Sequence, residues 1–129
     1  MFLSVQQKFI LDTLKKLNCV RRRQLRALVR GQFEKDSFQV TQARMDAMLR
    51  QLRMGTFNVR MDDELVWLSN AQPGSRRLEA MDVMIELTGG RPQEFNTSRK
   101  PPQLLRFAYG GDGLRPFTVA SLDTAPAGL

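Results

Sequence analysis

The chain has 129 residues, with 20 Lys and Arg against 13 Asp and Glu, which gives a formal net charge of +7. Its 42% hydrophobic and 26% charged residues are typical of a globular protein, and its length fits one ordinary domain or a small domain with an extension. The absence of histidine excludes a Ser-His-Asp triad and a His-ligated zinc site, and the single cysteine, Cys19, excludes an internal disulfide or a CxxC metal site.

The basic charge is concentrated in the first part of the chain. Residues 1–69 hold 13 Lys and Arg against 7 Asp and Glu, whereas residues 70–129 hold 7 against 6. Residues 1–60 alone carry 13 basic and 4 acidic side chains, a net charge of +9. This distribution favours anionic partners, and nucleic acid first among them.

Three features bear on cellular location. The first residues lack a basic stretch followed by an apolar run, so we expect no signal peptide. No stretch approaches the roughly 18 apolar residues of a membrane span, and a lone thiol fits a reducing compartment. We therefore expect a cytoplasmic protein that has no membrane partner.

The first predicted helix begins after Ser4, a capping residue, and runs to about Leu17. Its apolar residues repeat at helical spacing and form two stripes. The core stripe contains Leu3, Ile10, Leu14 and Leu17, and the second stripe contains Phe2, Val5 and Phe9. The second stripe needs its own cover, either the C-terminal half of the chain, which is the favoured interpretation, or a second copy in a homodimer.

A short connection at residues 18–20, which could form a strand stub, leads to a second helix over residues 21–30. Gly31 is expected to end this helix, and residues 32–39 to form a polar loop that Phe33 and Phe38 pin to the core. Leu25, Leu28 and Val29 face inward in this arrangement. A row of basic side chains lies beside them, formed by Arg22, Arg26 and Arg30 with Arg23 nearby.

The third predicted helix starts near Val40 and Thr41 and ends at Gly55. Its core stripe contains Met45, Met48, Leu49 and Leu52. The opposite face contains Ala43, Ala47, Arg50 and Met54, and it is flanked by Gln42, Arg44, Asp46, Gln51 and Arg53. Strands at residues 56–61 and 64–69 follow, joined by a turn at Asp62 and Asp63.

This order of elements is the layout of a winged helix-turn-helix domain over residues 1–69. In such domains the third helix enters the major groove of double-stranded DNA. Gln42 and Arg44 are the residue types that read adenine and guanine edges. The expected phosphate contacts come from basic residues of the second and third helices, namely Arg22, Arg23, Arg26, Arg30, Arg50 and Arg53.

The predicted hairpin turn is acidic, which argues against an ordinary DNA-inserting wing. Asp62, Asp63 and Glu64 carry a charge of roughly −3, whereas a wing in a minor groove offers Arg or Lys. The alternative is a protein-interaction module without DNA binding, with this turn and the Phe2, Val5 and Phe9 stripe as contact surfaces. Trp67, on the face opposite Val66, is expected to pack beside Arg60.

The rest of the chain is predicted to be a linker (70–74), a helix-plus-β-hairpin extension (75–122) and a disordered tail (123–129). Ser75 caps the helix, which ends at Thr88, and Glu79 and Asp82 on its surface can pair with Arg76 and Arg77. Residues 91–103 are expected to be extended or loose, before strands at 104–109 and 116–122. The predicted fold class is therefore α+β.

No arrangement typical of an enzyme is present. The glycines of residues 110–113 lie in a turn between strands and not before a helix, so they are no phosphate-binding loop. No candidate nucleophile has a base beside it. We expect no catalysis, no cofactor, no metal and no small-molecule substrate.

Residues 7–69 resemble the winged-helix portion of replication-relaxation-type proteins of bacterial plasmids and integrative elements. The resemblance lies in apolar spacing at residues 11–14, 23–25, 45–55 and 66–68. It implies a DNA-binding protein that acts as a dimer and regulates transcription or replication of a mobile element. Relatives continue into a nuclease-like α/β region, but residues 75–122 contain no strand with a Glu-x-Lys pair. The resemblance thus implies a shortened, non-catalytic extension used for dimerisation or docking.

Overall fold

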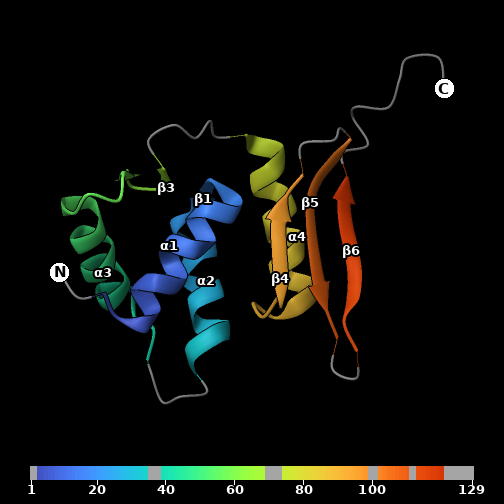
Figure 1. The fold of residues 1–129 in the computed structure, drawn as a ribbon, viewed down its shortest axis with the longest axis horizontal. Coiled ribbons are helices and arrows are strands. Elements are labelled where there is room, and N and C mark those ends of the chain that lie inside the picture. The colour runs from blue at the N-terminus through green and yellow to red at the C-terminus, as the bar shows by residue number, and fades with distance from the viewer. Residues whose placement is uncertain (1–2, 35–38, 69–73, 99–101, 111–112, 121–129) are drawn as a thin grey trace.

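The computed structural model of the chain describes residues 3–34, 39–68, 74–98, 102–110 and 113–120 (Figure 1). These residues form an α+β fold with four helices and two three-stranded antiparallel sheets. Phe2, Phe38, residues 70–73 of the predicted linker and the predicted tail at 123–129 lie outside the described residues.

The first sheet and three helices come from the N-terminal part. The sheet has the strand order β1-β3-β2, and Val20 pairs with Val66 while Arg60 pairs with Trp67. The elements are α1 (Val5–Leu17), β1 (Cys19–Arg21), α2 (Arg22–Phe33), α3 (Gln42–Met54), β2 (Val59–Met61) and β3 (Leu65–Leu68).

Helix α1 begins and ends where the sequence predicts. Ser4 accepts a hydrogen bond from the backbone N–H of Gln7, and the Gln7 side chain accepts one from the backbone N–H of Ser4, which completes a capping box. Asn18 ends the helix with a positive φ of 70°. The predicted core stripe is confirmed, since Ile10, Leu14 and Leu17 are buried and Leu3 packs against the core.

The predicted end of the second helix at Gly31 is wrong. Helix α2 continues to Phe33, whose side chain is buried. Gly31 lies inside the helix, and the segment that follows α4 approaches it closely there. A Cβ atom at Gly31 would stand 1.9 Å from the carbonyl oxygen of Gly90, just beyond helix α4 (Ser75–Thr88). The glycine therefore provides close packing between two elements and not a helix stop.

The β2–β3 hairpin turns one residue later than predicted. The backbone N–H of Asp62 donates to the carbonyl oxygen of Leu65 at 3.0 Å, so Asp63 and Glu64 are the central residues. The faces of the strands are nevertheless as expected. Val66 is buried, and Trp67 is half-buried opposite Arg60, because moving the turn by one residue in each strand preserves the alternation.

The C-terminal part contains one more strand than the predicted helix and hairpin. After α4 come β4 (Glu94–Thr97), β5 (Gln103–Tyr109) and β6 (Arg115–Ala120), in the sheet order β4-β5-β6. Gly74 and not Ser75 is the N-cap of α4. The region predicted as loose thus contains a strand, and Phe95 of this strand is paired with Phe107 and buried.

The two parts share one hydrophobic core. Buried side chains of α1, α2 and the first sheet belong to the same cluster as Met81, Met84, Phe95 and Leu105. Lys16 of α1 lies over the Phe95 ring at 5.0 Å, and its carbonyl oxygen accepts a hydrogen bond from Thr97. Figure 1 shows α3 at one end of the molecule and the second sheet at the other.

Replacing Gly31 with alanine tests the close approach of α2 to the turn after α4. In an open helix interior this change stabilises a protein by about 0.8–1.0 kcal/mol through helix propensity. Here the clash with Gly90 predicts a loss of about 1–3 kcal/mol in the free energy of unfolding, measured with urea. Gly113→Ala, where nothing lies within 4 Å of the added Cβ, is the control and should stay within about 0.5 kcal/mol. A Gly31→Ala protein as stable as the unaltered chain contradicts this packing.

Candidate nucleic-acid interface

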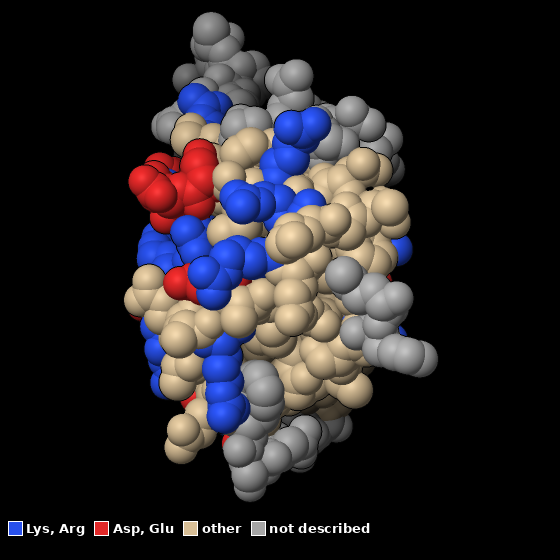
Figure 2. Space-filling view, turned by 90° about the vertical axis from the view of Figure 1, so that its left-hand side faces the viewer, with Lys and Arg blue, Asp and Glu red and all other residues tan. Residues whose placement is uncertain are grey.

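The exposed face of α3 is the first component of the site. Thr41 caps the helix by accepting from the backbone N–H of Arg44, and Met45, Leu49 and Leu52 bury the inner face. The predicted outer residues Gln42, Ala43, Arg44, Ala47, Arg50, Arg53 and Met54 are all exposed. Figure 2, which views the molecule from the α3 end, shows Lys and Arg side chains gathered over one side of this face.

The arginines of α3 differ in their contacts. Within the described residues, neither Arg50 nor Arg53 forms an ion pair. Arg44 donates through its guanidinium to the carbonyl oxygen of Gln39 at 3.2 Å. Ala43 and Ala47 are small enough to let a ligand approach the helix backbone. The face therefore offers two arginines, Arg50 and Arg53, without an ion pair among the described residues.

A groove of about 420 Å³ between α2 and α3 is the second component. Its walls bring together five of the eight predicted DNA contacts, and Arg44, Arg50 and Arg53 lie on the outer face of α3 instead. The five residues in the groove are Arg22, Arg23, Arg26, Arg30 and Gln42. Asp46 and Asp63 line the same groove, so its charge is mixed.

The arginine row of α2 is largely engaged within the chain. Arg22 forms an ion pair with Asp46 and donates to the Asp62 carbonyl oxygen at 3.2 Å. Arg30 pairs with Glu34 at 3.0 Å, one helical turn later. Arg26 donates through Nε to the carbonyl oxygen of Val40 at 3.1 Å, which holds its side chain across the groove.

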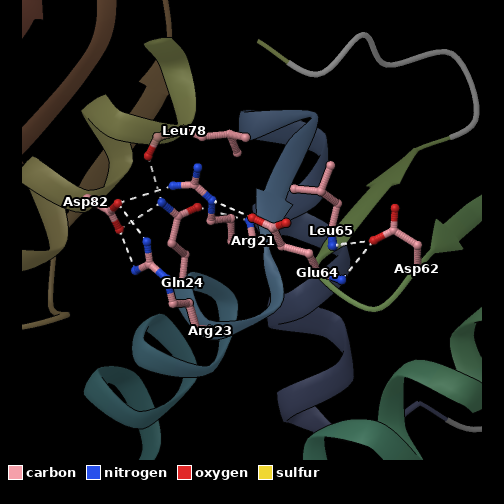
Figure 3. Close-up of polar contacts among 8 residues, drawn as sticks. All are labelled: Arg21, Arg23, Gln24, Asp62, Glu64, Leu65, Leu78 and Asp82. Carbon is pink, nitrogen blue, oxygen red and sulfur yellow. Dashed lines mark hydrogen bonds and ion pairs between the residues drawn. The ribbon is translucent and has the colours of Figure 1, made fainter. Parts of the chain in front are cut away.

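Arg23, the fourth of these arginines, points toward α4 and joins a polar cluster there (Figure 3). Its Nη1 and Nη2 donate to the two carboxylate oxygens of Asp82 at 2.7 and 2.8 Å. Arg21 donates to the same carboxylate at 3.4 Å and Gln24 at 2.9 Å. The expected pairing of Asp82 with Arg76 or Arg77 is therefore wrong, because its partners come from the β1–α2 corner.

Gln24 is the buried member of this cluster. Its side chain, 1% exposed, accepts from the backbone N–H of Arg21 at 2.9 Å and donates to the carbonyl oxygen of Leu78 at 2.6 Å. Each of its polar atoms is thus satisfied, as burial requires. The hydrogen bond from Arg23, followed by that from Gln24 and the charge of the arginines, holds the pKa of Asp82 below its usual value despite partial burial.

The acidic turn is also tied to its own chain. The Asp62 carboxylate accepts from the backbone N–H groups of Glu64 at 2.8 Å and Leu65 at 2.6 Å, and these bonds lower the pKa of Asp62. Glu64 pairs with Arg21 at 3.1 Å. Only Asp63 of the three acids faces the α2–α3 groove as a lining residue. The turn therefore presents fewer carboxylates without an intramolecular partner than its composition indicates.

The second apolar stripe of α1 is only partly covered. Phe9 packs edge-to-face on Phe33 at 5.5 Å between ring centroids, so its cover comes from within the chain but from α2 and not from the C-terminal half. Val5 remains 65% exposed, and Phe2 is not among the described residues. Among the described residues, Val5 is therefore the one exposed side chain of this stripe.

Other chemistry is sparse. Burial, followed by the charge of Asp62, raises the pKa of Cys19, so this thiol is not activated as a nucleophile. The described residues contain no group of three or more potential ligands positioned for a metal ion. Among the described helices, none combines the length and apolar character needed to cross a bilayer.

Asp82→Asn tests the cluster between α2 and α4 through its pH dependence. Because the folded pKa is lowered, the carboxylate stabilises the fold above its unfolded pKa of about 3.9, and this is lost as the pH falls through the folded value. The side chain is 36% exposed and therefore screened, so we expect a loss of about 1 kcal/mol at pH 7. Urea unfolding should show that the difference from the unaltered chain shrinks below about pH 4.

Asp12→Asn, which removes an exposed partner of Lys16 at 3.3 Å, is the matched control. It should change the free energy of unfolding by less than Asp82→Asn at pH 7. An equal effect of the two substitutions at pH 7, or a constant deficit of Asp82→Asn down to pH 2–3, would contradict the described role of Asp82.

No protein-family model, curated protein or solved structure matches the chain. The function proposed below is therefore inferred from the charge and geometry of the α3 face and from the order of the elements around it.

Proposed function

We propose that residues 3–68 form a winged helix-turn-helix unit that binds double-stranded DNA through the outer face of α3. The observation that carries this proposal is the exposed face of α3, on which Arg50 and Arg53 form no ion pair within the described residues. The element order helix, strand, two helices and hairpin, with the strand order β1-β3-β2, supports the fold assignment.

The dimensions of α3 suit the major groove. An α-helix with its side chains is about 10–12 Å in diameter, and the major groove is about 12 Å wide. Ala43 and Ala47 would allow the helix backbone to approach the base edges. Gln42 and Arg44, in the first turn, are the candidates for base contacts, and Arg50 and Arg53 reach phosphates farther along the helix.

The contacts of the acidic turn support DNA binding over the protein-interaction alternative. Two of its three acids are engaged within the chain, Asp62 by backbone N–H groups and Glu64 by Arg21. The ion pair with Arg21 partly neutralises Glu64, which lowers the net charge that the turn offers to a basic partner. In the proposed complex the turn points away from the DNA backbone, since its remaining charge is negative.

Removing the two arginines of the outer face tests the electrostatic part of the proposal. Each phosphate contact contributes about −0.9 to the slope of log K against log salt, so Arg50→Ala/Arg53→Ala should reduce the magnitude of the slope by about 2. The measurement is fluorescence anisotropy with random-sequence duplex DNA over a salt series. Exposed arginines without ion pairs can be replaced by alanine in a helix at little cost in stability.

Arg106→Ala is the control for this experiment, since it removes an exposed positive charge from β5, in the second sheet. Its slope should equal that of the unaltered chain. Undetectable binding at low salt, or an equal slope for the double substitution and the control, would refute the α3 surface as the DNA contact.

Arg44→Ala tests base recognition separately from affinity. We expect the variant to keep most of the salt slope but to lose about 1–3 kcal/mol of discrimination at one base pair, because a bidentate arginine contact specifies guanine. Selection of bound sequences from a random duplex library measures this preference. Arg50→Ala should show the reverse pattern, a reduced slope with an unchanged preference, and identical preferences for Arg44→Ala and the unaltered chain would exclude Arg44 from base recognition.

A further inference from the structure

The groove between α2 and α3 contains one arginine whose charge is not balanced. Arg22 is paired with Asp46, Arg23 with Asp82 and Arg30 with Glu34. Arg26, midway along the row, forms no ion pair among the described residues. Arg26 is therefore the arginine of the groove that the described residues leave without an ion pair.

Arg26 is also held in place before any ligand arrives. Its side chain is half-buried, and Nε is fixed by the hydrogen bond to the carbonyl oxygen of Val40 at 3.1 Å. The terminal Nη1 and Nη2 atoms remain as a planar pair of donors. Such a fork binds a carboxylate or phosphate with two parallel hydrogen bonds, and prior immobilisation reduces the entropy lost on binding.

The floor beneath Arg26 is apolar. Met45 and Leu49, which are 3% and 1% exposed, line the groove together with Ala27. A volume of about 420 Å³ lies within the range of small-molecule sites, which combine apolar walls with a few placed polar groups. An anion with an apolar body can contact these side chains while its charged group binds Arg26, which an inorganic ion cannot do.

The two acids that line the groove make its two ends electrostatically different. Asp46 is bound to Arg22, and Asp63 follows the residue whose carbonyl oxygen Arg22 also contacts, so both acids lie toward the Arg22 end. An anionic group is repelled from that end and attracted to Arg26. The apolar body then has room over Met45 and Leu49.

From this arrangement we propose that the α2–α3 groove is a binding site for a small organic anion, a phosphate monoester or carboxylate with a planar apolar body. Arg26 is the residue that binds the anionic group, and Ala27, Met45 and Leu49 contact the body. Of the residues that line this groove, Gln42 alone also belongs to the outer face of α3, and the proposed anion contacts do not depend on whether that face binds DNA.

The test is a titration of the full chain with phenyl phosphate, followed by backbone amide chemical shifts. We expect saturable shifts on the facing sides of α2 and α3, at millimolar or lower concentration. Inorganic phosphate should bind about tenfold more weakly, because it cannot cover the apolar floor. Absence of saturable shifts, or equal affinities for the two probes, overturns the proposal.

Dimethyl phosphate distinguishes a free organic anion from a phosphate of the DNA backbone, since it reproduces the backbone diester. We expect it to bind more weakly than phenyl phosphate. If it binds equally well, the groove is a binding site for backbone phosphates and the proposal of a small-molecule site is wrong. This result would leave the DNA-binding proposal standing, so the two can fail separately.

Arg26→Gln should weaken phenyl phosphate about tenfold, as loss of charged hydrogen bonds predicts, whereas Arg53→Gln makes the same charge change on the outer face and should have no effect. Asp63→Asn, an exposed substitution that leaves the Arg26 anchor intact, should tighten binding about twofold by removing a repelling charge. It provides a readout if Arg26→Gln disturbs folding. Equal affinity in the unaltered chain and the Arg26→Gln variant, or weaker binding in Asp63→Asn, contradicts the assignment.

Discussion

The carboxylate of Asp82 holds α2 in position against α4, and the groove proposed as an anion site depends on that position. It accepts hydrogen bonds from Arg21, Arg23 and Gln24, three side chains at the corner where β1 becomes α2. At the other end of α2, Gly31 lies against Gly90, just past the end of α4. Two contacts at opposite ends therefore hold α2 along α4, and the remaining face of α2 forms one wall of the groove.

This arrangement divides the basic residues into groups with different roles. Arg21 and Arg23 join the two parts of the chain, and Arg22 and Arg30 are paired with acids near the groove. The positive charge left for partners is consequently smaller than the composition indicates. Among the predicted DNA contacts in the described part of the chain, Arg26 inside the groove and Arg50 and Arg53 on the outer face of α3 form no ion pair. A composition-based estimate of DNA affinity that counts every arginine would be too high.

Local signals made much of the fold predictable. The Ser4 cap, the apolar periods of the first three helices and the alternation in β2 and β3 each depend on neighbouring residues, and the structure agrees with them. The end of α2 and the role of Asp82 depend on residues more than 50 positions away. Gly31 has the sequence context of a helix stop, and Asp82 has that of a solvated helix surface. Strand β4 was missed because it is short and largely polar, with only Phe95 buried.

The central claim is that the outer face of α3 contacts DNA, and amide chemical-shift mapping with a random-sequence duplex at low salt tests it most directly. The claim predicts that the largest changes fall on residues 42–54, with the amides of β4, β5 and β6 little affected. Changes concentrated on the second sheet, or no changes at concentrations that saturate other DNA-binding domains, would contradict it.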